Sequence, residues 1–139
     1  MFKRVLIPTD LTDRTVRALQ VAGSLAVAHL PQITLLHVIE TIAGAEFEEL
    51  SSFYSTMERR ARERMNDLIA RTPGRQGEIH VAIVYGRRAE EVIRFTQENA
   101  IDLIVLASHP VEPSKPSSGL GTMSYKLGIL APCAVLLVK

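Results

Sequence analysis

The chain of 139 residues contains one cysteine, no tryptophan and only 5% aromatic residues. A single cysteine cannot form a disulfide within the chain, and this pattern favours a reducing, intracellular setting. The uninterrupted apolar stretches reach about six residues, whereas about 20 are needed to span a bilayer. Thr9 and Asp10 interrupt the amino-terminal segment before an apolar region of signal-peptide length can form. We therefore expect a cytoplasmic protein with no secretory signal and no membrane-spanning segment.

An excess of either charge is also absent. Sixteen Lys and Arg residues stand against 15 Asp and Glu residues, which gives a formal net charge of +1 and a pI near 8.0. This near-balance provides no general electrostatic reason to expect nucleic acid or an anionic membrane as a partner. With 47% hydrophobic and 22% charged residues, the composition is that of a globular protein and excludes a disordered or fibrous chain. We expect a single domain over residues 1–139.

Short apolar runs alternate with amphipathic segments along the whole chain. The apolar runs predict five strands, over residues 5–7, 33–39, 79–85, 101–107 and 133–138. Helical spacing of apolar residues predicts four helices: one capped by Thr12 or Asp13 and continuing to Leu30, and three over residues 46–71, 88–99 and 122–130. The inward stripe of the second helix includes Phe53 or Tyr54, and Met57, and Glu58 can pair with Arg62 on the outer face. Strands alternating with helices predict an α/β fold with an open parallel sheet and helices on both faces.

Small and polar residues collect at one predicted edge of this sheet. In an open parallel sheet, ligands bind beyond the carboxyl ends of the strands, near the point where the strand order reverses. Helix amino termini gather at the same edge and favour anions such as phosphate. The residues that the pattern places there are Pro8, Thr9, Asp10, Gly86, Ser108, His109, Gly121 and Thr122.

Several segments match a known family in order and spacing. They cover residues 5–10, 34–38, 86–93, 102–109 and 131–138, and thus span essentially the whole chain. Together they resemble the universal stress protein family. The resemblance implies an open five-stranded parallel sheet of order 3-2-1-4-5 with a Rossmann-like, adenine nucleotide alpha hydrolase-like fold. It also implies a homodimer, and a family in which some members bind ATP and others do not.

The loop after the fourth strand departs from the motif of the ATP-binding members, Gly-x2-Gly-x9-Gly-Ser/Thr. Ala107 and Pro110 occupy its first two glycine positions, and ten residues rather than nine separate Pro110 from Gly121. Glycine lets backbone approach a ribose or phosphate closely, whereas proline fixes φ and has no amide to donate. The end of the motif survives in Gly121 and Thr122, which still suit a phosphate at a helix start.

The resemblance places the adenosine contacts at Asp10 and at the backbone of Val38. The full set of candidate nucleotide-binding residues is Pro8, Thr9, Asp10, Val38, Ala107, His109, Gly121, Thr122, Met123 and Ser124. The implied ligand is ATP or AMP, with Mg²⁺ accompanying ATP, or no nucleotide at all.

The same residues also have purely structural interpretations. Asp10 can serve as a turn or cap acceptor, and Gly86 can serve the turn from strand to helix. Cys133 is interpreted as a small residue that opens a buried strand, and His37 as a strand residue with a local hydrogen bond. The four histidines lack metal-ligand spacing, so no metal site is predicted, and His109 alone lies at the candidate edge.

Catalytic motifs that occur on this architecture are missing from the sequence. A P-loop would need Gly-x4-Gly-Lys-Ser/Thr, and a Rossmann dehydrogenase would need Gly-x-Gly-x-x-Gly after the first strand. Without a Gly-x-Ser-x-Gly elbow, Ser108 is not assigned as a nucleophile. No catalytic residue is assigned, and nucleotide hydrolysis through Asp10 or His109 is the less favoured hypothesis.

Two hypotheses for the function follow from the resemblance. The preferred one is a homodimeric stress-response or regulatory domain that binds ATP or AMP weakly or not at all and acts on an unidentified protein partner. The alternative is an ATP-binding, nucleotide-responsive member of the family. In the family order the last strand, from Cys133 to Val138, lies at a sheet edge, and it has no Lys or Pro inside it. Because a bare apolar edge invites pairing, we expect the homodimer to form through this strand.

Overall fold

The computed structural model describes residues 2–25, 30–74, 77–119 and 121–139. The elements, in chain order, are β1 (Arg4–Pro8), α1 (Arg14–Ser24), β2 (Gln32–Glu40), the 3₁₀ helix η1 (Glu48–Leu50), α2 (Ser51–Ala70), β3 (Ile79–Gly86), α3 (Arg88–Glu98), β4 (Leu103–Ala107), the 3₁₀ helix η2 (Pro116–Gly119), α4 (Met123–Leu130) and β5 (Ala134–Val138). Every predicted strand and helix has a counterpart, with shifted ends.

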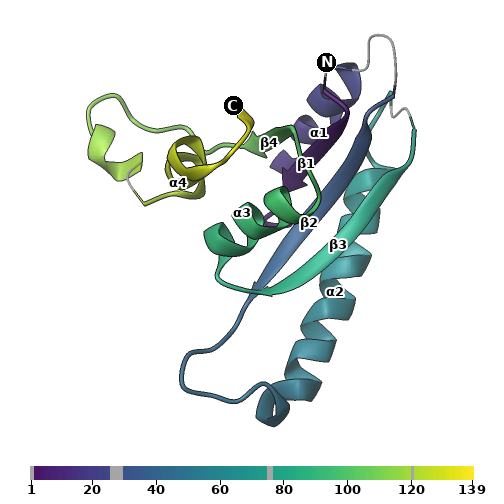
Figure 1. The fold of residues 1–139 in the computed structure, drawn as a ribbon, viewed down its shortest axis with the longest axis vertical. Helices are drawn as coiled ribbons and strands as arrows, with labels where there is room; N and C mark the ends of the chain where they lie inside the picture. Colours follow the sequence, from purple (N-terminus) through teal and green to yellow (C-terminus); the bar gives the residue numbers. More distant parts are fainter. Residues whose placement is uncertain (1, 26–29, 75–76, 120) are drawn as a thin grey trace.

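The strands form one parallel sheet of order β3-β2-β1-β4-β5, which confirms the predicted topology (Figure 1). β1 lies at the centre, and Val5 faces Ile33 of β2 on one side and Leu103 of β4 on the other. After β3 the chain crosses to the opposite side of β1. The strand order therefore reverses between β1 and β4, where open parallel sheets form a crevice.

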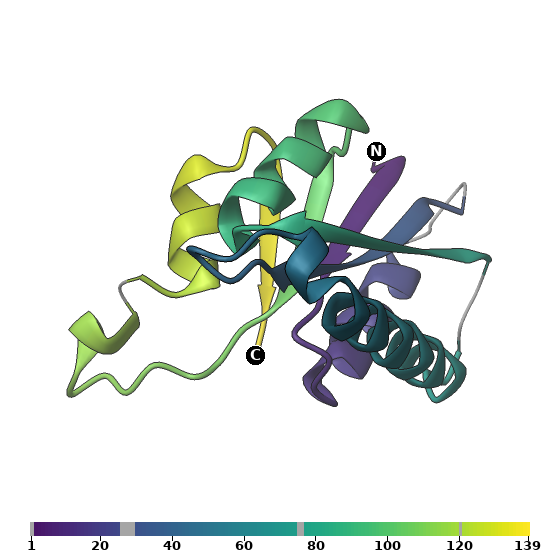
Figure 2. The same cartoon turned by 90° about the horizontal axis from the view of Figure 1, so that it is seen from below.

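The core has two layers because successive side chains of a strand point to opposite faces of the sheet. Val5 and Ile7 of β1 pack with Leu19 of α1 and Met65 of α2. Leu6 packs on the other face with residues of α3 and α4. Both faces of β1 are buried, which accounts for its continuous apolar run. Figure 2 shows α1 and α2 on one side of the sheet and α3 and α4 on the other.

The segment predicted as one helix over residues 46–71 is divided into η1 and α2. The buried face of α2 consists of Tyr54, Ala61, Met65, Leu68 and Ile69. Of the predicted alternatives Phe53 and Tyr54, Tyr54 is the one that faces inward, whereas Phe53 is 48% exposed, and Met57, which we predicted to face inward, is 37% exposed. The prediction is wrong because the amino-terminal part of α2 extends past the ends of β2 and β3, beyond the sheet that would cover these side chains (Figure 1).

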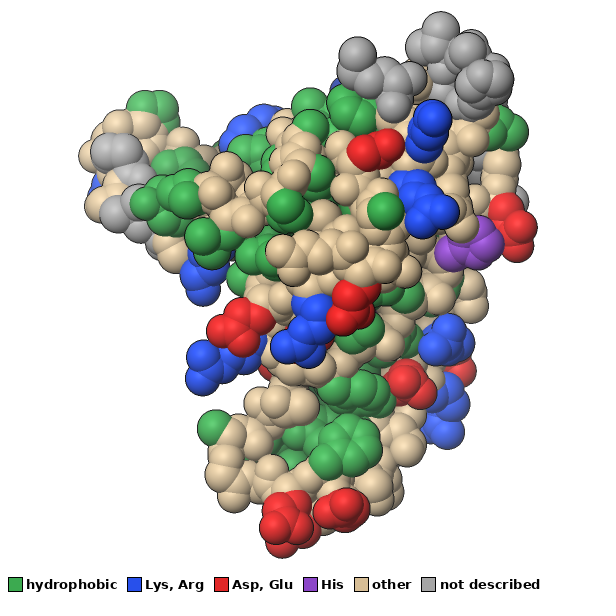
Figure 3. Space-filling model, in the orientation of Figure 1, with side chains coloured by type: hydrophobic (Ala, Val, Ile, Leu, Met, Phe, Trp, Pro, Cys, Tyr) green, Lys and Arg blue, Asp and Glu red, His purple; other side chains and the backbone are tan. Residues whose placement is uncertain are grey.

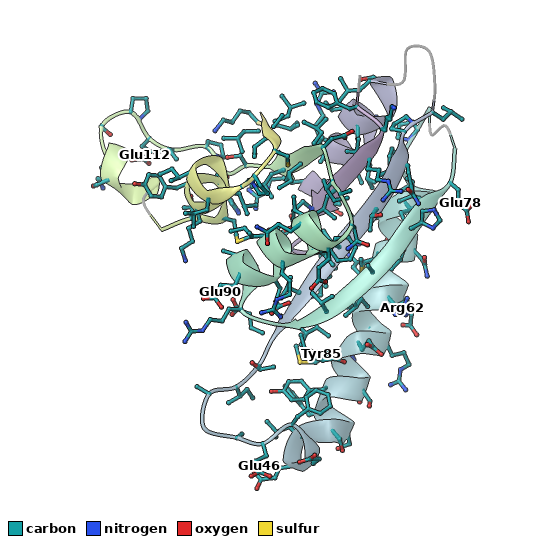
Figure 4. All side chains as sticks on the ribbon, viewed as in Figure 1. Glu46, Arg62, Glu78, Tyr85, Glu90 and Glu112 are labelled. Carbon is teal, nitrogen blue, oxygen red and sulfur yellow. The ribbon has the colours of Figure 1, made fainter. Side chains whose placement is uncertain are left out.

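An aromatic cluster packs against this protruding end of α2. The ring of Phe47 stacks on Tyr54 at a centroid distance of 5.1 Å and meets Tyr85 edge-on at 5.3 Å. Tyr85, at the end of β3, points toward this end of α2 (Figure 4). Its hydroxyl donates to Glu58 at 3.2 Å. The predicted pair of Glu58 with Arg62 is not among the ion pairs within the described ranges, because Glu58 turns toward β3 instead.

The ends of α1 differ from the prediction in two ways. Asp13 occupies the N-cap position, but its side chain caps no amide there and instead accepts hydrogen bonds from Arg64 and Arg71 of the α2 region. The helix ends at Ser24, earlier than predicted. The predicted continuation over residues 26–29 lies outside the described residues.

The carboxyl-terminal strand β5 is an edge strand with partly exposed side chains. It begins at Ala134, so Cys133 precedes the strand and is half-buried, not the buried strand residue that we predicted. Residues 109–119, between β4 and α4, extend away from the body of the molecule (Figure 1), and Glu112 lies on this segment (Figure 4). Among the described helices, none combines the length and the apolar composition needed to cross a membrane.

Candidate functional site

A cavity of about 550 Å³ opens at the carboxyl ends of β1 and β4. This is the point at which the strand order reverses, where open parallel sheets form a ligand-binding crevice. Its apolar wall includes Leu36, Val38 and Leu106 of the sheet and Val92 of α3. Small-molecule sites measure about 300–1,000 Å³ and combine such a wall with a few polar groups. The cavity therefore has the size and lining of a small-molecule site.

The structure brings together all of the predicted site residues except one. The residues that line the cavity are Pro8, Thr9, Asp10, Val38, Ala107, His109, Thr122, Met123 and Ser124. Gly121 is exposed and lies outside the lining, and its φ of +81° is one that glycine adopts without strain. Its visible role is to turn the chain into α4.

Asp10 acts as a turn acceptor through one carboxylate oxygen and places the other at the cavity. Its Oδ1 accepts hydrogen bonds from the amide (3.0 Å) and the hydroxyl (2.6 Å) of Thr12, as a turn acceptor does. Its Oδ2 lies 3.9 Å from Nε2 of His109 at the cavity. Partial burial raises the pKa of Asp10, but the hydrogen bonds from Thr12, with Arg14 and His109 nearby, lower it below its usual value. The carboxylate is therefore ionised at neutral pH and can accept hydrogen bonds from a ligand.

Side chains from three elements hold the loop that carries Asp10. The hydroxyls of Thr9 and Thr15 lie 2.6 Å apart, and Thr9 Oγ1 accepts from the amide of Leu11 at 2.9 Å. Nδ1 of His37 on β2 lies 2.9 Å from the Thr9 carbonyl, so this histidine makes a hydrogen bond as predicted, although the partner lies 28 residues earlier in the chain and is not local. Nε of Arg64 on α2 donates to the Leu11 carbonyl at 3.0 Å. These hydrogen bonds fix the position of the segment that carries Asp10.

A second polar group lies on the β4 and β5 side of the cavity. Ser108, directly after β4, is 3% exposed. Its Oγ accepts hydrogen bonds from Ser124 Oγ at 2.9 Å and from Lys139 Nζ at 3.2 Å, and donates to the His109 carbonyl at 3.3 Å. The amide of Ser108 donates to the Val138 carbonyl at 2.8 Å, which fixes the end of β5 beside it.

The start of α4 completes this side. Thr122 is the N-cap residue, and its hydroxyl accepts from the amide of Tyr125 at 3.3 Å. The first two helical residues, Met123 and Ser124, line the cavity. First-turn amides of a helix lack intrahelical acceptors and attract anions. This end of the cavity is therefore suited to a negatively charged group.

Sequence reasoning missed two cationic residues of the lining. Arg88, at the start of α3, places Nε 3.9 Å from Oε1 of Glu40. Lys139 follows β5, two residues after Leu137, which also lines the cavity. Strand alternation could have placed Lys139 on the same face as Leu137, although no motif singles it out. Within the described ranges, no three His, Cys, Asp or Glu side chains are grouped so as to hold a metal ion.

The sheet order and the cavity at its reversal point define a small Rossmann-like α/β domain with a ligand-sized site. The model of the universal stress protein family matches residues 1–139, and the chain belongs to this family. A universal stress protein of Thermus aquaticus, from the QAH/OAS sulfhydrylase 3′ region, is 30% identical over 141 residues, which cover 100% of both chains.

Two solved structures with the same fold contain nucleotides. One is a universal stress protein in complex with cAMP, with a TM-score of 0.67 and 19% identity over 99% of this chain and 97% of that one. The other is the universal stress protein from Archaeoglobus fulgidus in complex with dAMP, with a TM-score of 0.59 and 16% identity over 99% of this chain and 98% of that one. At these identities the likeness shows the shared fold.

Proposed function

We propose that this protein is a stress-response binding domain that holds an adenine nucleotide with a single phosphate in the cavity between β1 and β4. The observation that carries the proposal is the cavity itself, which joins an apolar wall, an ionised carboxylate and the amino terminus of a helix at the point where the strand order reverses. The complexes of two family structures with cAMP and dAMP support the same ligand class. The open cavity favours nucleotide binding over the hypothesis of a site that has lost its ligand.

The polar residues fit the two ends of a nucleotide. Oδ2 of Asp10 accepts hydrogen bonds, as the ribose hydroxyls require, and the side chains of Val38 and Leu106 offer an apolar surface to a base. Lys139 and the first-turn amides of α4 offer donors to a phosphate on the other side.

A triphosphate fits less well than a single phosphate. Among the side chains that could meet a phosphate at the cavity, Nε of Arg88 already lies 3.9 Å from Glu40, and Nε2 of His109 lies 3.9 Å from Asp10. Pro110 stands in the loop where ATP-binding members have glycine, and it has no amide to donate to a phosphate. We therefore expect ATP, with its Mg²⁺, to bind weakly or not at all.

The proposal is tested by extraction and calorimetry. Small molecules released by heat from freshly purified protein are identified by mass spectrometry, and titrations follow with AMP, cAMP and MgATP. We expect an adenine monophosphate in the extract and an affinity for AMP above that for MgATP. An empty extract, with no heat from any of these ligands at millimolar concentration, contradicts the proposal.

Asp10→Asn is the variant that tests the carboxylate. The asparagine Oδ1 can still accept from Thr12, so the turn is retained while the charge is lost. We expect AMP affinity to fall about tenfold, in line with the loss of a hydrogen bond to a charged group. Glu98→Ala, at the end of α3 on the opposite edge of the sheet, is the control and should leave affinity unchanged. Equal affinities for both variants would remove Asp10 from the site.

We also propose a homodimer that forms through β5. Leu136 on this edge strand is exposed, as are Ile129 and Leu130 at the end of α4. Figure 3 shows hydrophobic side chains gathered over the α4 side of the molecule. An uncovered apolar edge is a liability that a second copy of the chain removes. Such a dimer would present one ligand site from each copy to a further protein partner.

The dimer is tested by light scattering on Leu136→Lys. A charge on the edge strand opposes pairing, so this variant should be monomeric while the unmodified protein is dimeric. Leu30→Lys alters an exposed leucine just before β2, away from β5, and should leave the dimer intact. A dimer that persists in Leu136→Lys refutes the β5 interface.

A further inference from the structure

We infer that Lys139, positioned by Ser108, binds the phosphate of the nucleotide and gives the site its preference for nucleotides over nucleosides. The inference rests on the proposed function and adds to it the residue that recognises the anionic part of the ligand.

Ser108 has no hydrogen-bonding position left for a ligand. A hydroxyl offers one donor and two acceptor sites. The Oγ of Ser108 accepts from Ser124 and from Lys139 and donates to the carbonyl of His109, so all three sites are used within the protein. The side chain is also 3% exposed. Ser108 therefore acts as a positioning residue and not as a ligand-binding one.

Lys139, in contrast, has donors to spare. An ammonium group carries three N–H donors, and one of them goes to Ser108 at 3.2 Å. Within the part of the chain that the structure describes, Lys139 donates to no other side chain, so two of its donors remain available at the cavity that this residue lines. A lysine ammonium binds phosphate as a compact point charge.

The backbone holds Lys139 at this place. The hydrogen bond from the Ser108 amide to the Val138 carbonyl joins the ends of β4 and β5. Leu137 and Lys139 occupy alternate positions and both line the cavity, as side chains on one face of a strand do. The ammonium is thus directed to the cavity by both its backbone and its side-chain partner.

The distribution of charged side chains around the cavity favours an anionic group near Lys139. His109 lies 3.9 Å from the carboxylate of Asp10, and Arg88 lies 3.9 Å from that of Glu40. Of the two Lys and Arg side chains in the described lining, Arg88 and Lys139, it is Lys139 that forms no ion pair with an Asp or Glu carboxylate. A ligand with hydroxyls at one end and a phosphate at the other, as in a nucleoside monophosphate, matches Asp10 and Lys139 in turn.

The test compares AMP with adenosine by calorimetry on the full chain at low salt. We expect the unmodified protein to bind AMP about tenfold more tightly than adenosine, the size expected of one charged hydrogen bond. In Lys139→Met the AMP affinity should fall to that of adenosine, while the adenosine affinity stays unchanged. Ser108→Ala should reduce the ratio of the two affinities in part. Added salt should weaken AMP binding to the unmodified protein more than to Lys139→Met.

Lys3→Met is the matched control, because Lys3 precedes β1 at the opposite edge of the sheet. It removes one positive charge and should leave both affinities unchanged. An unchanged ratio in Lys139→Met overturns the inference and leaves the proposed function standing, and a parallel loss of both affinities overturns it as a structural effect. If the unmodified protein binds neither AMP nor adenosine, the proposed function and the inference both fail.

Discussion

Replacement of Arg64 by Met tests how strongly α2 holds the loop that carries Asp10. Nε of Arg64 donates to the carbonyl of Leu11, 53 residues earlier in the chain, at 3.0 Å. Arg71 provides a matched control. Both arginines bond the same two carboxylates, those of Asp13 and Asp67, at distances of 2.8 to 3.1 Å. The difference between Arg64→Met and Arg71→Met therefore isolates the hydrogen bond to Leu11.

The hydrogen bond from Arg64 holds Leu11 in a strained backbone conformation, and the strength of this bond sets the expected difference in stability. Its φ of +69° lies in the left-handed region, which costs a non-glycine residue about 1–2 kcal/mol and persists only when neighbours hold it. A hydrogen bond from a charged donor contributes about 1.5–3 kcal/mol when well buried. Because the side chain of Arg64 is 36% exposed, we take a lower value of about 1 kcal/mol. For a chain of this size, that corresponds to about 3 °C in Tm.

The free energy of unfolding of both variants is measured by urea denaturation followed by circular dichroism, and the data are fitted with one shared m value. We expect Arg64→Met to be about 1 kcal/mol less stable than Arg71→Met. We also expect it to bind adenosine more weakly, because the segment that presents Asp10 is less constrained. Equal stabilities and equal affinities of the two variants would refute the conclusion that Arg64 braces this loop.

Three further predictions address other parts of the fold. Gly86 has a φ of +146°, and a Cβ there would lie 2.7 Å from the side chain of Glu91, so Gly86→Ala should lose about 2 kcal/mol in urea denaturation. The hydrogen bond from Arg71 lowers the pKa of Asp13, so its stabilisation is complete above about pH 4 and is lost as pH falls through the folded pKa. The Tm difference between Asp13→Asn and the unmodified protein should therefore shrink from pH 7 toward pH 3. Burial raises the pKa of the Cys133 thiol, so iodoacetamide at pH 7 should alkylate the native protein more slowly than the urea-unfolded chain, as followed by mass spectrometry.

The strands of the sheet were predictable because their signal is local. A strand buried on both faces, such as β1 or β4, is an uninterrupted apolar run, and the alternation with helices fixes a parallel sheet. The strand order came from the resemblance to the family, since local patterns carry no information about which strands are neighbours. The exposed positions of Phe53 and Met57 were not predictable, because helical periodicity does not reveal where the sheet beneath a helix ends.

The edge that holds the site was predictable for a different reason. Parallel strands bring their carboxyl ends to one edge of the sheet, so Asp10 and Thr122 were expected at the same edge, and both line the cavity there. The long-range side-chain contacts at this edge were not predictable from the sequence. Lys139 reaches Ser108 across 31 residues, and Arg64 reaches Leu11 across 53, and neither pair belongs to a local motif. Such pairs depend on the exact register of strands and helices, which sequence patterns leave undetermined.

The structural roles of the site residues and their proposed roles in ligand binding depend on one another. Oδ1 of Asp10 accepts hydrogen bonds from Thr12, and these bonds orient the carboxylate so that Oδ2 lies toward His109 at the cavity. The hydroxyl of Ser108 makes all three of its hydrogen bonds within the protein, and one of them positions the ammonium of Lys139. A group held in this way loses little conformational entropy when a ligand arrives, so its contribution to affinity is larger than that of a mobile side chain. Loss of a positioning partner should therefore weaken binding even where no contact with the ligand is removed.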